Sequence, residues 1–221
     1  LSGRVVCFLS RSFPNEYGLP PINRFRRSFE MTQQGPNPVD LYEAAVQYMH
    51  GIIAGVKAEQ FGDPTPCDQW NVQELIVHNV KVSQAIHNML TDGEHVNVFE
   101  VSDQLSPEDA LAAFEASTGQ LMQAAGVRAN LEKLVDRYGR QLTGRELLMA
   151  PFSDLLIHKW DLAKATEQDS TLDSAMAEAS YGFFLPRMET MRDSGNFGRG
   201  ISIPITASSQ DKLLALTGRE P

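Results

Sequence analysis

Apolar side chains at helical spacing are the feature of this sequence that most constrains its fold. From Met31 onward, long segments place apolar residues three or four positions apart, and short stretches rich in glycine, proline and polar residues separate these segments. A segment of this kind forms a helix with one apolar face, and several such helices bury their faces against one another. The sequence therefore predicts an all-α fold, a four-helix bundle with an additional C-terminal helix and short extended segments.

Capping residues and prolines place the predicted helices along the chain. The predicted helical segments are Pro38 to about Lys57, Asn71 to the Asp92–Gly93 turn, Ser106 to Gly126, a fourth from Thr143 that includes Asp154–Thr166, and a fifth from about Asp173 to Arg192. Pro151 lies inside the fourth segment and should kink or restart it just before Asp154, and Pro186 lies inside the fifth. Outside these helices we expect two short extended segments and a small capped helix at the end of the chain, at residues 131–142, 201–205 and 208–221.

Residues 1–30 differ in composition from the rest of the chain. They carry five arginines against two glutamates, show no helical period, and begin with Leu1 rather than a methionine. An arginine-rich, acid-poor segment can be a targeting signal, but we favour a disordered arm or a translated upstream stretch. We therefore expect the folded domain to span residues 31–221, with a short C-terminal extension from about residue 196.

The charge balance and the cysteine count exclude several classes of partner. Subtracting the five basic and two acidic residues of 1–30 from the totals of 19 and 28 leaves 14 basic and 26 acidic residues, a net charge of −12. Such an acidic domain is poorly suited to bind nucleic acid. No apolar run approaches the ~18 residues of a membrane-spanning helix. With only two cysteines, Cys7 and Cys67, the chain is not a disulfide scaffold, and we expect a cytoplasmic protein.

One stretch, DLLIHKWDLAKAT (Asp154–Thr166), carries two acids and a histidine on one helix face. Asp154 lies four residues before His158 and Asp161 lies three after it, so at about 100° per residue the three side chains fall within roughly 60°. Burying two acids and an imidazole together is unfavourable unless a positive charge lies between them. A divalent metal ion would supply that charge.

His78, on the second predicted helix, could complete this site. If that helix packs beside the fourth, His78 faces Asp154 and His158. Two imidazoles and one carboxylate are the usual three protein ligands of a catalytic metal, and they leave the remaining positions to water or substrate. A lone histidine in an apolar stripe is, however, more often a hydrogen-bonded packing residue. Spacing alone leaves both interpretations open.

Other residues near the predicted site also have two interpretations each. Asp161 could orient a metal ligand, or it could be a salt-bridge partner of Lys159 or Lys164. Cys67 precedes the second helix, where its thiolate could react or bind the metal, although cysteine is also a small buried hydrophobe. The remaining histidines have no acidic or histidine partner at ligand spacing on their own helices, and we interpret them as surface or packing residues: His50, His87 and His95.

Two motifs resemble those of a known metalloprotein family. TPCDQWNVQELIVH (residues 65–78), followed much later by DLLIHKWDLAKAT, is similar to the actinobacterial DinB-like family that includes the N-terminal domain of mycothiol-dependent maleylpyruvate isomerase. The resemblance implies a DinB-like four-helix bundle, a divalent metal, Zn²⁺, held by His78, Asp154 and His158, and mycothiol as a cosubstrate. In the isomerase the acidic ligand is a glutamate, one methylene longer than Asp154. The isomerase also has a separate C-terminal domain, whereas this chain has only a short segment after the fifth helix.

The resemblance favours an enzyme and leaves other functions open. A metal-bound low-molecular-weight thiol loses its proton at neutral pH and can attack an electrophilic substrate, which gives S-transfer or isomerisation. In this interpretation Asp161 is the candidate catalytic residue, which orients a ligand imidazole or a water. The alternatives are a metal-hydroxide hydrolase and a non-catalytic metal-binding or stress-related protein, which a fourth ligand from Cys67 would favour. No nucleic-acid or membrane partner is expected, and a homodimer is the assembly to test.

Overall fold

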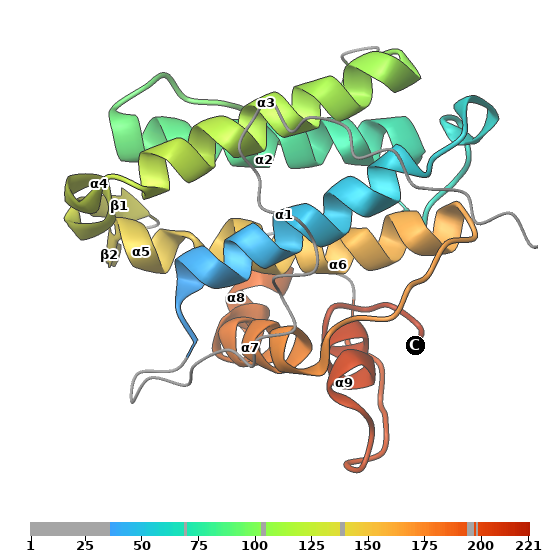
Figure 1. Ribbon diagram of the computed structural model, residues 1–221. Helices are drawn as coiled ribbons and strands as arrows, with labels where there is room; N and C mark the ends of the chain where they lie inside the picture. Colours follow the sequence, from blue (N-terminus) through green and yellow to red (C-terminus); the bar gives the residue numbers. More distant parts are fainter. Residues whose placement is uncertain (1–35, 69, 103–104, 138–139, 194–196, 198) are drawn as a thin grey trace, which may run out of the picture.

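The computed structural model describes residues 36–68, 70–102, 105–137, 140–193, 197 and 199–221, which form a mainly helical domain (Figure 1). The prediction for residues 1–30 lies outside this part of the chain. The described helices and strands, in chain order, are α1 (Pro38–Ala54), η2 (Ala58–Gln60), α2 (Val72–Thr91), α3 (Pro107–Ala125), α4 (Arg128–Glu132), β1 (Leu134–Arg137), β2 (Arg140–Thr143), α5 (Gly144–Leu147), α6 (Met149–Ala165), α7 (Ser174–Phe184), η3 (Leu185–Arg187), α8 (Met188–Asp193) and α9 (Ser209–Leu216). Among these described helices, none combines the length and the apolar composition that crossing a bilayer requires.

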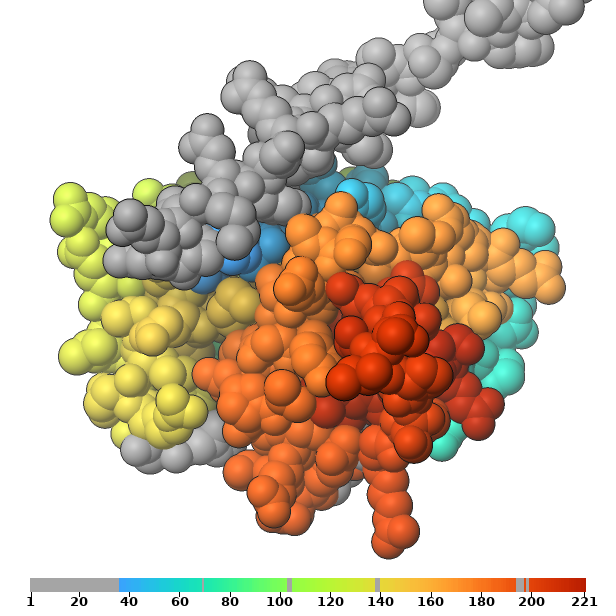
Figure 2. Space-filling model, turned by 90° about the horizontal axis from the view of Figure 1, so that it is seen from below, coloured from blue at the N-terminus to red at the C-terminus, as the bar shows by residue number. Residues whose placement is uncertain are grey.

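Four long helices form a bundle (Figure 1). Helix α2 packs against α3 and α6, and α1 packs against the same two helices. Helix α7 packs against α6 and α9, so that the chain after α6 covers one face of the bundle (Figure 2). The predicted all-α four-helix bundle with an additional C-terminal helix is therefore confirmed.

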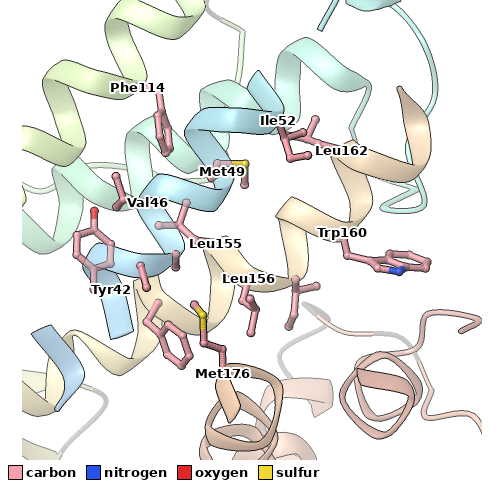
Figure 3. Close-up of a cluster of buried hydrophobic side chains, with 14 of the residues drawn as sticks. Tyr42, Val46, Met49, Ile52, Phe114, Leu155, Leu156, Trp160, Leu162 and Met176 are labelled. Atoms are coloured by element: carbon pink, nitrogen blue, oxygen red, sulfur yellow. The ribbon is translucent and has the colours of Figure 1, made fainter. Parts of the chain in front are cut away.

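Large apolar side chains fill the core between the bundle helices (Figure 3). Tyr42 and Met49 of α1, Phe114 of α3 and Leu155 of α6 are almost completely buried. Burying an apolar side chain of this size stabilises the fold by about 1.5–3 kcal/mol. The buried hydroxyl of Tyr42 shares a hydrogen bond with Ser83 of α2, so the core encloses this polar group without leaving it unsatisfied.

The predicted helix starts are confirmed by the caps themselves. Asn71 and Glu74 form a reciprocal capping box at α2, and Thr143 and Glu146 form another at α5. The side chain of Ser106 caps α3. Each cap satisfies backbone N–H groups that the first turn of a helix leaves free, which is why these starts can be predicted from local sequence.

The fourth and fifth predicted helices are both interrupted. Helix α5 ends at Leu147 and α6 restarts at Met149, so Pro151 lies in the first turn of α6, where its missing N–H leaves no hydrogen bond unmade. The prediction of a break just before Asp154 is therefore wrong, because the helix restarts before the proline. Pro186 lies in the short helix η3, which divides the fifth predicted helix into α7 and α8.

The two predicted extended segments differ from each other. Strands β1 and β2 form an antiparallel hairpin, in which Leu134 pairs with Thr143. Residues 201–204 form neither a helix nor a strand, a turn follows at residues 205–206, and the Ile201 N–H donates to the Ala215 carbonyl of α9 over 2.9 Å. The hairpin thus lies at one end of the bundle (Figure 1), while the second segment precedes α9 in the chain and is bonded to the end of that helix through Ile201.

Candidate metal centre

The three predicted metal ligands lie together where α2 packs against α6. His78 belongs to the first half of α2, and Asp154 and His158 lie one turn apart on α6. The His78 Nε2 atom is 3.2 Å from Asp154 Oδ2, and the His158 Nε2 atom is 3.6 Å from Asp154 Oδ1. Both imidazole Nε2 atoms therefore face one carboxylate.

The donor atoms lie close enough together to share one metal ion, and the two histidine–Asp154 distances are near those of a tetrahedral site. One atom from each of the three residues lies within 4.8 Å of the other two. Ligand atoms about 2.0–2.2 Å from a tetrahedral zinc ion lie ~3.3–3.6 Å from one another. Asp154 Oδ2 is buried, and its neighbour His78 Nε2 at 3.2 Å makes no hydrogen bond to it, so that a cation between the two atoms would satisfy this oxygen. The residues present therefore fit a divalent metal ion.

The loop before α2 places an aromatic ring against the histidines. Thr65 Oγ1 donates to the Trp70 carbonyl over 2.7 Å and accepts from the Cys67 N–H, which holds this loop in shape. The Trp70 ring stacks on His78 with 4.2 Å between centroids, and it meets His158 edge-on at 6.0 Å. Ring contacts of this kind contribute about 0.5–1.5 kcal/mol beyond the burial itself. The loop thus stabilises the positions of both histidine rings.

Each histidine has a hydrogen-bond acceptor on the side away from Asp154. His78 Nδ1 donates to the Val98 carbonyl over 2.8 Å, and His158 Nδ1 donates to Asp161 Oδ2 over 2.8 Å. A hydrogen atom on Nδ1 leaves the lone pair of a neutral imidazole on Nε2. These acceptors therefore make both Nε2 atoms available to one metal ion, as the outer partners of metal-bound histidines do.

Asp161 is fully buried and pairs with an arginine from the end of the chain. Arg219 Nε donates to Asp161 Oδ1 over 3.0 Å, and Nη2 donates to Oδ2 over 2.7 Å. Lys159 instead donates to two backbone carbonyls, and the Lys164 ammonium lies over an aromatic ring. The interpretation of Asp161 as a lysine partner is therefore wrong, because its partners are His158 and Arg219.

Arg219 is the residue of this site that the sequence analysis missed. Gly218 has a φ of 85°, the Gly218 N–H donates to the Ala215 carbonyl over 3.3 Å, and the Arg219 N–H donates to the Leu214 carbonyl over 2.9 Å. This pair of hydrogen bonds is the Schellman ending of a helix, in which glycine adopts the left-handed conformation. A glycine at this position predicts the turn, but it does not indicate which side chain the tail then contacts.

Electrostatic interactions in the metal-free site couple Asp154 to both histidines. Burial by itself would raise the pKa of Asp154, but His158 and His78 hold that pKa well below its usual range. Burial by itself would lower the pKa of His158, but the carboxylates of Asp154 and Asp161 raise it to about 9. In the metal-free protein at neutral pH, His158 is therefore a cation, and a binding metal ion has to displace its proton.

The half-buried thiol of Cys67 lies beside this site. Its Sγ atom, one atom of His158 and one atom of Asp161 all lie within 4.8 Å of one another. Cys67 thus shares His158 with the predicted ligand set but is not grouped with His78 and Asp154. The other described histidines either bond to groups of α3 or are exposed: His50, His87 and His95.

Residues 42–163 match the mycothiol maleylpyruvate isomerase N-terminal domain, which is more than half of the chain. The chain belongs to this family. The resemblance found in the sequence motifs is thus confirmed. The match includes the residues that we predicted as ligands on α2 and α6, and it ends before α7, so that Arg219 lies outside it.

Relatives and solved structures agree with this membership. The uncharacterized proteins Rv0738 and MT0763 of Mycobacterium tuberculosis are each 24% identical to this chain over 141 residues, which is 64% of this chain and 74% of the relative. Two crystal structures of the mycothiol-dependent maleylpyruvate isomerase, one of them of a mutant, are 15% and 16% identical, have a TM-score of 0.59, and are matched over 74% of this chain and 73% of theirs. At this identity the likeness shows a shared fold, the DinB-like helical bundle.

Proposed function

We propose that this protein is a metal-dependent enzyme that activates a low-molecular-weight thiol of the mycothiol type. The observation that carries the proposal is the convergence of His78, Asp154 and His158, whose donor atoms fit one divalent ion. Two imidazoles and a carboxylate suit zinc, and three protein ligands leave a coordination position for a thiol. Membership in a family named for a mycothiol-dependent isomerase supports a thiol cosubstrate.

The chemistry divides between the ion and the protein. A bound Zn²⁺ would lower the pKa of a coordinated thiol, so that a nucleophilic thiolate exists at neutral pH. His78 and His158 would hold the ion through Nε2 and Asp154 through its carboxylate. Asp161, the predicted catalytic residue, acts here by positioning: it keeps the proton of His158 on Nδ1. The reaction class we propose is addition of the thiol sulfur to an electrophilic substrate, giving S-transfer, or isomerisation if the adduct reverses.

A non-catalytic metal site is the second candidate, and the position of Cys67 is the observation that favours it. The Cys67 Sγ atom groups with His158 and Asp161 rather than with His78 and Asp154, so its thiolate would close the coordination shell only after a shift toward those two residues. Structural zinc sites are normally closed by four protein ligands, whereas catalytic sites stay open. A hydrolase that uses metal-bound hydroxide would need the same histidines and carboxylate but no thiol.

Three finer points belong to the proposal. Zinc is the proposed ion, the proposed location is cytoplasmic, and the proposed assembly is a homodimer. The isomerase that the sequence resembles has a glutamate where this chain has Asp154. Because the aspartate is one methylene shorter, we expect the ion to lie nearer α6 and the electrophilic substrate to differ.

Cobalt substitution tests the thiol proposal directly. The Co²⁺-loaded protein is titrated with mycothiol or 2-mercaptoethanol, and the sulfur-to-cobalt charge-transfer absorption is measured. A new band that saturates at one thiol per metal supports the proposal, whereas one bound cobalt per chain with no response to either thiol contradicts it. His95→Ala, a change at an exposed histidine, is the control and should respond like the wild type.

A second pair of measurements separates the enzyme from the alternatives. Cys67→Ala should keep the metal, the charge-transfer band and the thermal midpoint if the site is open. Loss of metal together with stability in this variant would indicate a structural site. Incubating the metal-loaded protein with a panel of electrophiles, with and without the thiol, distinguishes thiol transfer from hydrolysis, because only hydrolysis proceeds without the thiol.

A further inference from the structure

The last residues of the chain reach the metal centre. After α9, the turn at Gly218 reverses the backbone direction and brings Arg219 against Asp161, a residue 58 positions earlier in the chain. The Arg219 side chain is only 10% exposed, and Asp161 is not exposed at all. A guanidinium buried to this extent beside a buried carboxylate is a specific contact rather than a solvated surface pair.

Arg219 uses both oxygens of the Asp161 carboxylate. Nε bonds Oδ1 over 3.0 Å and Nη2 bonds Oδ2 over 2.7 Å, while Nη1 bonds the Thr217 carbonyl over 3.1 Å. A two-point contact between a planar guanidinium and a planar carboxylate fixes the orientation of the carboxylate, and a lysine ammonium does not. The same Oδ2 atom accepts from His158 Nδ1 over 2.8 Å. The orientation of the His158 ring is thus coupled to the C-terminal tail.

We infer that Arg219 is a positioning residue of the metal centre, acting through Asp161. It keeps the Asp161 carboxylate in the plane in which Oδ2 accepts the Nδ1 proton of His158, so that His158 presents Nε2 to the ion. The inference rests on the proposed metal site and extends it to a residue outside the domain that the family match covers, which ends at residue 163. The metal centre is complete only when the segment after α9 has docked.

Metal titration of Arg219 variants tests this role. Arg219→Met removes the guanidinium that makes two hydrogen bonds to Asp161. It should weaken Co²⁺ binding by about 10-fold or more, the usual effect of losing a residue that supports a metal ligand. Arg219→Lys keeps the charge that Asp161 needs and should keep the fold, but it should still weaken binding because it lacks the two-point contact. Arg187→Met is the matched control, since Arg187 of η3 is another arginine that bonds a backbone carbonyl and lies over an aromatic ring of α7.

A double variant distinguishes positioning from a general loss of stability. If Arg219 acts through Asp161, the Asp161→Asn/Arg219→Met protein should bind Co²⁺ no more weakly than Asp161→Asn alone. Additive losses in the double variant would overturn the inference. So would an unchanged affinity in folded Arg219→Lys and Arg219→Met, or an equal loss in Arg187→Met.

Nuclear magnetic resonance of the metal-free protein tests the inference separately from the metal site. The Nδ1–H proton of His158 should exchange slowly with water in the wild type and in Arg187→Met, and rapidly in Arg219→Lys and Arg219→Met. Slow exchange in all four proteins would overturn the role of Arg219. If exchange is slow in the wild type and fast in the Arg219 variants, but the wild type takes up no metal, the role of Arg219 stands and the proposed function is rejected.

Discussion

The two sides of the metal centre hold their histidines by different means. On the α2 side, His78 is fixed by a backbone carbonyl, that of Val98, and by the stacked ring of Trp70. On the α6 side, His158 is fixed by a buried carboxylate that is itself held by Arg219. One side therefore depends on neutral groups within 20 residues of its histidine, and the other depends on a buried ion pair whose arginine comes from a distant part of the chain.

Because one histidine is held by a neutral acceptor and the other by a buried ion pair, mutation and pH should affect the two sides differently. A backbone carbonyl is present whatever side chain its residue carries, so the acceptor of His78 tolerates substitution. A buried ion pair is sensitive to the loss of either partner, because the remaining charge is left uncompensated. We expect the α6 side to be the one that mutation and pH disturb.

The largest expected effect is shared by both sides. His78→Ala and His158→Ala each remove one of three ligands, and each should reduce metal uptake below detection while the fold is retained. Equilibrium dialysis followed by elemental analysis measures the metal content per chain. If either variant still bound one metal ion per chain, the histidine it lacks would not be a ligand.

Asp161→Asn should have the next largest effect. The amide keeps the size and one acceptor oxygen, but it no longer matches both His158 and Arg219 as a carboxylate does. Losing such an outer partner weakens metal binding by about 10- to 100-fold. Calorimetric titration measures the affinity, and Asp193→Asn at an exposed position is the control. An unchanged affinity would mean that the charged arrangement on the α6 side does not contribute to the site.

The thermal stability of the metal-free protein should depend on pH through His158, on the α6 side of the site. Because folding raises the pKa of His158 from 6.5 to about 9, its protonation stabilises the metal-free fold fully below about pH 6.5. That contribution is lost as the pH rises through about 9, so the thermal midpoint of chelated protein should fall over this window. Metal binding should strengthen over the same window, by up to about tenfold per pH unit, because fewer sites carry the competing proton. His158→Gln lacks a metal ligand, so only its thermal midpoint is compared: it should not fall over this window, and identical midpoint profiles for variant and wild type would contradict this assignment.

The smallest effect should come from Val98→Ala. This change shortens a half-buried side chain but leaves in place the carbonyl that accepts from His78. Metal affinity should stay within about twofold of the wild type. A tenfold loss would show that the α2 side depends on side-chain packing of the loop as strongly as the α6 side depends on charge.

Part of this site could be predicted from short-range patterns. The helical repeat places Asp154, His158 and Asp161 on one face, and the structure has all three there. The position of His78 beside them followed only from assuming that its helix packs against α6, an assumption that the resemblance to a known family supported. The break before Met149 was misplaced because the proline rule tells where a helix cannot continue, and not where it actually restarts.

Local interactions explain what the amino-acid order alone determines in this protein. Helix caps, proline positions and the spacing of ligands along α6 act within about one helical turn, so the chain encodes them directly. The contacts of His78 with Val98 and of Asp161 with Arg219 join residues 20 and 58 positions apart. The Asp161–Arg219 contact exists only after α7 has packed on α6 and α9 on α7, and the His78–Val98 contact exists only after the loop that follows α2 has folded back along that helix, so folding beyond one helical turn is what brings these groups within hydrogen-bonding distance.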